Sequence, residues 1–355
     1  MKTFLIQRSK ATFLLLSVLF LFVSIFSFYV LPKHFFYDAV VIALDKGNEI
    51  GFFGSYPLTI LFYKITGLRY LPFPIVGLIQ FPILMYVLYA IGIPADFQKI
   101  NVKNVLVYLG ILMIAIFMSM PSKEFITYLF VSLIVFQFIN KKITFHTALF
   151  SSLFLLAFFG VFFRPYFFLI PIIATVMFGA SCVNFKNKTL MTVFYGLLIA
   201  IFLSLCFGVV SGHYFSEVSR EVVNSSRLGS ADANSSIISP VKPDTWYGET
   251  IGIVYGFFSV NVPLNGFKHI FSPQILVFVI WQLFLFYILL VRFSRCIAAR
   301  DTHKNELWVL LILFAFFIIQ GVFEPDLGSA VRHKIGVFPL IYYALYYDHF
   351  RKKLQ

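Results

Sequence analysis

Five ionisable side chains crowd into residues 324–334, between two strongly apolar stretches. They are Glu324, Asp326, Arg332, His333 and Lys334. Arginine binds phosphate through paired hydrogen bonds and lysine acts on it as a point charge, while histidine and carboxylates serve as general acids and bases. Because the three basic residues come just before an expected helix, backbone N–H groups there could also attract an anion. The segment therefore carries residue types for proton transfer beside a phosphate, and a plain turn between two helices is the alternative.

One arginine stands alone among aromatic residues in the sequence Phe162-Phe163-Arg164-Pro165-Tyr166. An arginine within an apolar stretch is costly and usually faces the interior of a helix bundle or a cavity. Pro165 breaks the helix at this point, and broken helices are tolerated mainly around buried or cavity sites. We predict that Arg164 binds an anion; the alternative is an arginine that extends to lipid phosphates.

A third polar point is Lys123-Glu124, which follows Pro121-Ser122 at the start of another apolar stretch. In a functional interpretation, Lys123 contacts a phosphate and Glu124 orients it or acts as a base. In a local interpretation, Ser122 caps the helix and Glu124 lies favourably in its first turn. The sequence leaves both open.

Motifs for metal or nucleotide chemistry are missing from the sequence. It contains no HExxH, CxxC, P-loop or GxSxG motif. The three cysteines are expected within helices or at their inner ends, so no disulfide is predicted. We therefore predict no metal site and no cofactor.

The composition excludes a soluble protein. Of 355 residues, 60% are hydrophobic and 12% are charged, whereas soluble domains have about 45–50% and about 25%. A disordered chain would need low hydrophobicity and high charge, and a transmembrane barrel would alternate apolar and polar residues. The chain is therefore predicted to be an all-α polytopic membrane protein, a single integral membrane domain over residues 1–355.

About ten apolar stretches are long enough, or nearly so, to cross a bilayer as helices. They are residues 12–31, 73–93, 104–120, 125–140, 143–163, 165–183, 189–211, 272–292, 306–323 and 335–348. The first lacks a small-x-small cleavage site and is expected to remain as an anchor. The longest connection, residues 212–271, lies between the seventh and eighth spans, and its apolar part 250–263 is expected in the outer interface.

The distribution of basic residues orients these spans. With both termini in the cytoplasm, sixteen of the 28 basic residues and four of the 15 acidic residues fall inside. The inner segments then carry +12 of the net charge of +13, as the positive-inside rule requires. A crossing at residues 50–66 would violate that rule, so this stretch is predicted to be re-entrant or interfacial within the first outer loop, 32–72. The outer face is nearly neutral, and no nucleic-acid partner is expected.

The layout and three short patterns resemble the Wzy-type O-antigen and capsule polysaccharide polymerases of bacteria. The patterns are Pro121-Ser122-Lys123-Glu124 at a helix start, Arg164-Pro165-Tyr166 after an apolar span, and Gly328-Ser329-Ala330-Val331-Arg332-His333-Lys334 before the final span. These enzymes combine many spans with a cytoplasmic N-terminus and a large late periplasmic loop. The loops 32–72 and 212–271 would then be periplasmic.

The resemblance implies the bacterial inner membrane and an oligosaccharide repeat unit on undecaprenyl diphosphate as substrate. It also implies metal-independent glycosyl transfer, with membrane lipid and a chain-length regulator protein as partners. The diphosphate would meet Arg164, Arg332, Lys334 and Lys123. The general base would be His333, Glu324, Asp326 or Glu124.

Two other functions remain open on the sequence. A GT-C-type glycosyltransferase using a polyprenyl-monophosphate sugar would place essential acidic residues in the first outer loop, where Asp38, Asp45 and Glu49 lie. A flippase for the same lipid-linked glycan would carry charged residues along a path through the membrane. Here the polar residues stop at the outer interface, which disfavours a flippase.

Overall fold

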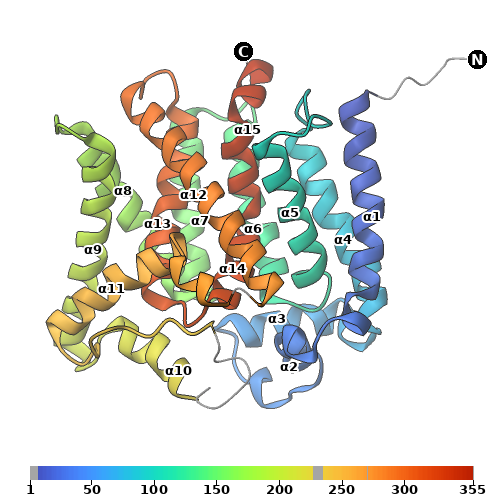
Figure 1. Cartoon of the computed structure of the whole chain (residues 1–355), viewed down its shortest axis with the longest axis horizontal. Helices are drawn as coiled ribbons and strands as arrows, with labels where there is room; N and C mark the ends of the chain where they lie inside the picture. Colours follow the sequence, from blue (N-terminus) through green and yellow to red (C-terminus); the bar gives the residue numbers. More distant parts are fainter. Residues whose placement is uncertain (1–6, 227–234, 270, 355) are drawn as a thin grey trace, which may run out of the picture. The chain divides into compact units, whose positions relative to one another are not determined.

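A computed structural model describes residues 7–226, 235–269 and 271–354, and over these residues the protein is all-helical (Figure 1). The β interaction that occurs among them is an isolated bridge between Ser236 and Asp326. Residues 227–234 and 270 of the predicted long loop lie outside the described residues.

The chain divides into two compact units. The first runs to Ser152 and resumes at Lys334, and the second is Leu153–His333. The helices of the first unit are α1 (Arg8–Val30), α2 (Tyr37–Leu44), α3 (Ser55–Ile65), α4 (Phe73–Ile91), α5 (Val102–Phe117), α6 (Lys123–Ile139) and α15 (Phe338–Leu354). Those of the second are α8 (Leu169–Cys182), α9 (Lys188–Ser211), α10 (Val222–Ser226), α11 (Trp246–Asn261), α12 (Pro273–Ala298) and α13 (Lys304–Phe323). Helices α7 (Phe145–Phe162) and α14 (Leu327–Gly336) each continue across the boundary.

Each of the ten predicted stretches overlaps a helix, although residues 335–348 include the end of α14, the break at Val337 and the first part of α15. Seven helical segments among the described residues are long and apolar enough to cross a membrane, namely α1, α4, α7, Pro165–Cys182, α9, Ile275–Ala298 of α12, and α13. Helices α5, α6 and α15 have 16, 17 and 17 residues. The protein is therefore a multi-pass helical membrane protein, while the count of ten spans stays a prediction.

Tyrosines hold α15 in the first unit. The hydroxyl of Tyr346 donates to Oδ1 of Asn104 at 2.6 Å, and that of Tyr342 donates to the carbonyl of Gly92 at 2.8 Å. The amide of Asn104 in turn donates to the carbonyls of Asp96 and Lys99 at 2.8 and 2.7 Å. These bonds join the end of α4 and the start of α5 to α15, and they satisfy polar groups that burial would otherwise penalise.

The segment 32–72, predicted as the first outer loop, is organised by Arg69. Its side chain donates to the carbonyl of Ala43 at 2.8 Å and forms an ion pair with Glu49. The predicted re-entrant or interfacial segment 50–66 contains the eleven-residue helix α3, which is about half the length that a span needs.

Helix α13 is the core of the second unit. Of an apolar 18-residue stretch of α13, 94% of the residues are buried, whereas 17% are buried in the corresponding stretch of α9. Both helices are apolar enough to span a membrane. A helix that is apolar all round packs inside a bundle or against lipid. Helix α13 takes the first role, because it packs against α8, α9, α11 and α12, and α9 presents most of its surface outward.

Glycines bring α11 into direct backbone contact with α13. A Cβ atom on Gly256 would lie 1.9 Å from the carbonyl oxygen of Gly321, and one on Gly321 would lie 2.5 Å from the backbone nitrogen of Phe257. Small residues at helix crossings permit such approach within membranes. The crossing continues to Asn261, whose amide donates to the carbonyl of Phe317 at 3.1 Å. Residues 250–261 of the predicted interfacial stretch thus belong to a helix that is packed against the core helix, oblique to α9 (Figure 1).

We expect Gly321→Ala to destabilise the protein by about 1–3 kcal/mol, because the new methyl group would overlap the α11 backbone. The midpoint of thermal unfolding in detergent measures the effect. Gly179→Ala in α8 is the matched control, because no atom lies within 4 Å of the added Cβ, and alanine favours a helix. Equal midpoints for the two variants would contradict the close crossing.

Candidate functional site

The imidazole of His333 pairs with the carboxylate of Glu324, and this pair is the centre of the candidate site. Nδ1 of His333 is in hydrogen-bond contact with Oε1 of Glu324. The Glu324 side chain is 4% exposed and that of His333 is 20% exposed. A carboxylate on Nδ1 orients the ring so that proton exchange with a substrate would occur through Nε2. Both residues were predicted as proton-transfer groups, and the structure brings them together.

The turn between α13 and α14 creates this pairing. Helix α13 ends at Phe323, and Glu324 is its extended C-cap residue. The amide of Gln320 donates to Oε1 of Glu324 at 3.2 Å and to the carbonyl of Ala330 at 3.1 Å, which fastens the end of one helix to the next. Asp326, also predicted as a base, accepts from the backbone N–H of Ser329 at 2.7 Å through Oδ1. This contact starts α14, so the geometry favours Glu324 over Asp326 as the partner of His333.

The surroundings of Glu324 keep it ionised. Burial alone would raise the pKa of this carboxyl. The charge of His333 and hydrogen bonds from His333, Ser329 and Gln320 outweigh burial, so the pKa lies below its ordinary value of 4.5. The carboxylate can therefore stabilise a positive charge on His333 when that ring accepts a proton.

Arg164 lies in a tight turn after α7. Its side chain is buried, 3% exposed, which argues against an arginine extended to lipid headgroups. The turn closes with hydrogen bonds from the N–H of Arg164 to the carbonyl of Phe159 at 3.0 Å and from the N–H of Phe167 to the carbonyl of Arg164 at 2.8 Å. The turn requires glycine at position 160, because a Cβ atom there would lie 2.3 Å from the backbone nitrogen of Phe168 and would clash with it.

Aromatic rings connect this turn to the His333 helix. The ring of Tyr166 stacks on Phe323 with centroids 5.5 Å apart and lies 6.3 Å from the ring of His333. Phe323 also contacts Phe215, from the segment after α9, at 5.6 Å. The Arg164 turn and the Glu324–His333 pair thus converge within the second unit. Sequence reasoning named Tyr166 only as part of a motif and missed its contact with His333.

Arg332, His333 and Lys334 do not form a single anion-binding site at the start of a helix. Helix α14 begins at Leu327, so residues 332–334 lie in its interior and their N–H groups are not at its N-terminus. The prediction that these groups attract an anion is wrong on this point, because the Asp326 cap starts the helix earlier. At 3.6 residues per turn, Arg332 and Lys334 project from nearly opposite sides. Arg332 is half-buried and Lys334 is fully buried.

Lys123 and Glu124 belong to the first unit. Nζ of Lys123 lies 3.5 Å from Oδ2 of Asp38 and 3.8 Å from the ring centroid of Tyr56, whose hydroxyl donates to Oδ1 of Asp38 at 2.7 Å. Ser122 accepts from the N–H of Phe125 at 3.1 Å, which confirms it as the N-cap. Glu124 is buried in the first turn of α6. The capping part of the local interpretation is therefore confirmed, Lys123 pairs with Asp38, and a role of Lys123 or Glu124 at a phosphate stays a prediction.

The other acidic residues of segment 32–72, Asp45 and Glu49, stabilise that segment itself. Oδ1 of Asp45 accepts from the N–H of Gly47 at 2.7 Å. Glu49 pairs with Arg69 and lies 3.6 Å from Nζ of Lys64. The hydrogen bond from Arg69 holds the pKa of Glu49 below its ordinary value.

Two buried charges in the second unit were not predicted as functional. The carboxylate of Glu249 on α11 accepts from Oγ of Ser204 at 2.5 Å and from the N–H of Ser216 at 3.2 Å. The guanidinium of Arg220 is completely buried and donates to the carbonyls of Gly252 and Gly321 at 3.2 and 3.0 Å. Gly248, Gly252 and Gly256, spaced four residues apart, were the available signal of a close helix crossing.

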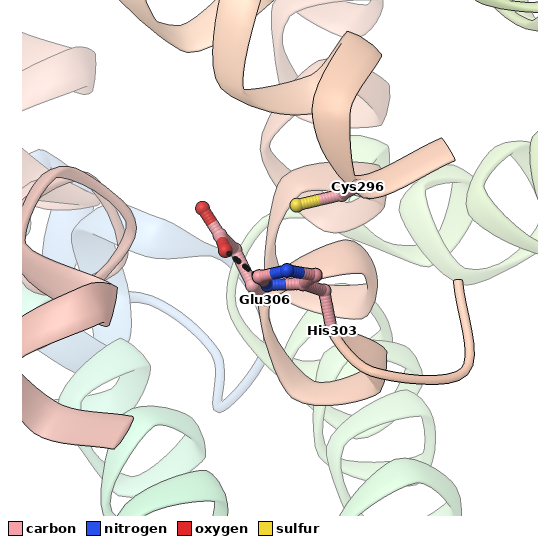
Figure 2. A group of neighbouring side chains, drawn as sticks. All are labelled: Cys296, His303 and Glu306. Carbon is pink, nitrogen blue, oxygen red and sulfur yellow. Dashed lines mark ion pairs between the residues drawn. The ribbon is translucent and has the colours of Figure 1, made fainter. Parts of the chain in front are cut away.

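A separate group, Cys296, His303 and Glu306, lies where α12 ends and α13 begins (Figure 2). Their ligand atoms all lie within 4.8 Å of one another. No compact sequence motif marks these three donors, because a helix end and a turn separate Cys296 from His303 and Glu306.

Comparison with known proteins gives no relative: no protein-family model, no curated protein and no solved structure matches this chain. A carboxylate-oriented histidine beside a buried arginine turn can take a proton from a hydroxyl and stabilise a developing anion.

We expect ionised Glu324 to stabilise the fold in a pH-dependent way. Because its folded-state pKa is depressed, this stabilisation is complete above the ordinary pKa of 4.5 and is lost as pH falls through the folded-state pKa. Glu324→Gln should lower the unfolding free energy by about 1–3 kcal/mol near pH 6, and the difference from the wild type should shrink as pH falls below 4.5 and through the folded-state pKa. Thermal unfolding across this range measures it. Glu217→Gln, in the exposed His213–Glu217 pair, should show no such trend; the same trend in that control would refute the assignment to Glu324.

Proposed function

We propose that the protein polymerises undecaprenyl-diphosphate-linked oligosaccharide units into a surface polysaccharide, O-antigen or capsule, as a Wzy-like glycosyltransferase. The observation that carries this proposal is the Glu324–His333 pair beside the Arg164–Tyr166 turn. A transfer of this kind needs a base for the acceptor hydroxyl and cations for the leaving diphosphate. The second unit has both kinds of group at one end of α13.

The proposed step is a displacement at the anomeric carbon of the growing glycan. The acceptor hydroxyl oxygen attacks that carbon while Nε2 of His333 takes the hydroxyl proton. The bond between the anomeric carbon and the diphosphate oxygen breaks, and the electron pair leaves with undecaprenyl diphosphate. Glu324 stabilises the resulting imidazolium, and Arg164, with Arg332 as a second cation, stabilises the negative charge on the diphosphate.

The membrane arrangement that goes with this function has ten spans, both termini in the cytoplasm, and the candidate site at the periplasmic face of the inner membrane. The charge asymmetry supports this orientation, because +12 of the net charge of +13 then lies inside. The exposed phenylalanines of α7, Phe150, Phe154 and Phe158, offer an apolar surface suited to a polyprenyl chain. A chain-length regulator protein is the expected protein partner.

Removing the base should abolish polymerisation. We expect His333→Gln to reduce long-chain glycan by at least about 100-fold, the usual contribution of a general base. Arg164→Ala should have a comparable effect, and Arg164→Lys should restore only part of the activity, because lysine lacks the planar fork of donors. The surface-glycan ladder of a strain lacking the gene, complemented with each variant, is the measurement.

The matched control for His333→Gln is His213→Gln, which removes the histidine of an exposed pair, His213–Glu217, in the same unit. It should leave the ladder unchanged. Quantifying each variant in isolated membranes separates lost activity from lost protein. Normal ladders from His333→Gln or Arg164→Ala at wild-type protein levels would rule out this site.

The location of unpolymerised substrate distinguishes a polymerase from a flippase. In a deletion strain we expect single repeat units to accumulate on the periplasmic leaflet, because transport across the membrane does not depend on the polymerase. Accessibility of these units to a membrane-impermeant glycan-modifying reagent in spheroplasts measures the leaflet. Accumulation on the cytoplasmic leaflet would favour a flippase instead.

A further inference from the structure

Three donor side chains of different chemistry meet between α12 and α13, away from the Glu324–His333 pair. Cys296 is in the last turn of α12 and 1% exposed, His303 is the N-cap residue of α13, and Glu306 is in the first turn of α13 and 2% exposed. Figure 2 shows the sulfur, the imidazole ring and the carboxylate gathered in the same small space. We propose that these residues bind a zinc ion.

The two carboxylate oxygens of Glu306 contact different residues, one Arg292 and the other His303. Its Oε1 accepts from Nε of Arg292 at 2.7 Å and lies 2.6 Å from Nη2 of the same residue. Its Oε2 faces Nδ1 of His303 at 3.3 Å. Arg292 and Cys296 are four residues apart on α12 and so lie on one face. The arginine thus fixes the carboxylate with one oxygen turned toward the histidine, as outer partners commonly orient metal-binding carboxylates.

The donor set selects the metal. A thiolate, an imidazole and a carboxylate are the three ligand types that zinc uses in proteins, and three protein ligands with one solvent molecule complete its tetrahedron. Magnesium and calcium prefer sites made of oxygen alone. In a tetrahedral zinc site the donor atoms are separated by about 3.3–3.8 Å, given metal–ligand bonds of about 2.0–2.3 Å. The observed limit of 4.8 Å therefore requires a contraction of about 1 Å or slightly more.

The turn between the two helices can provide that contraction, because His303 precedes the first helical residue of α13. The Arg292–Glu306 ion pair compensates the buried carboxylate when zinc is absent, so the fold does not depend on the metal. Bound zinc would join the end of α12 to the start of α13. The proposed orientation puts this group on the cytoplasmic side, where thiols stay reduced and able to bind metal.

Cobalt(II) gives a direct measurement, because it substitutes for zinc and absorbs through its thiolate bond. The purified full-length protein in detergent, stripped with a chelator, should bind one equivalent of zinc and, loaded with cobalt, show a near-ultraviolet thiolate band. Cys296→Ser should abolish this band and weaken zinc binding by at least about 100-fold. His303→Gln, at a half-buried position, should weaken binding by a similar factor and is the variant to use should Cys296→Ser fold poorly.

The matched controls are Cys182→Ser and Cys206→Ser, because both cysteines are exposed and separate from the group. They should retain the band and the zinc affinity. Excess zinc should raise the unfolding midpoint of the wild type and of these controls, but not that of His303→Gln. Failure of the wild-type protein to bind zinc, or a cobalt band that persists in Cys296→Ser and His303→Gln, would overturn the proposal. Neither outcome bears on the glycan ladder, so the two proposals stand or fall separately.

Discussion

The fully buried guanidinium of Arg220 is the interaction on which the second unit depends. It donates to the carbonyl of Gly252 on α11 and to that of Gly321 on α13, at the point where glycines allow the two backbones to touch. Gly321 is three residues before Glu324, so the same contact fixes the end of the helix that presents the candidate base. Buried charges need several hydrogen bonds to be tolerated. The contact that holds α11 against α13 therefore also sets the position of the candidate site.

The two proposed sites use carboxylates in the same way. At one end of α13, the carboxylate of Glu324 is in hydrogen-bond contact with the side chains of Gln320 and His333. At the other end, one oxygen of Glu306 accepts a hydrogen bond from Arg292, and its second oxygen faces His303. In both, a buried acid orients a histidine beside it. The difference lies in the third group: an arginine turn and aromatic rings at the first, and a thiol at the second. If both proposals hold, one core helix would support proton transfer at one end and metal binding at the other.

Much of the helical layout could be predicted, because an apolar run of membrane length has few alternatives to a helix. The candidate residues Arg164, Glu324 and His333 were also recognisable, since charge is rare in such a chain. Their pairing was not, because it depends on a turn at Glu324–Leu327 that moves the start of α14 ahead of the basic residues. Arg220 and Glu249 were missed for a related reason: in the sequence they belong to a long polar loop, and only tertiary contacts bury them. The pairing of Lys123 with Asp38 could not be predicted either, because the two residues are distant in the sequence.

The burial of Arg220 also has a consequence for how the chain is made. Its acceptor on Gly321 is 101 residues farther along the chain, so the ribosome needs about 5–20 s after synthesising Arg220 before that carbonyl exists. During this interval the guanidinium has no native acceptor on α13 and must stay hydrated outside the bilayer core. The segment that carries it can therefore enter its place only after α13 has been inserted. Assembly of the second unit is in this way ordered in time, because Arg220 can be buried only after α13, which is synthesised long after it, is in place.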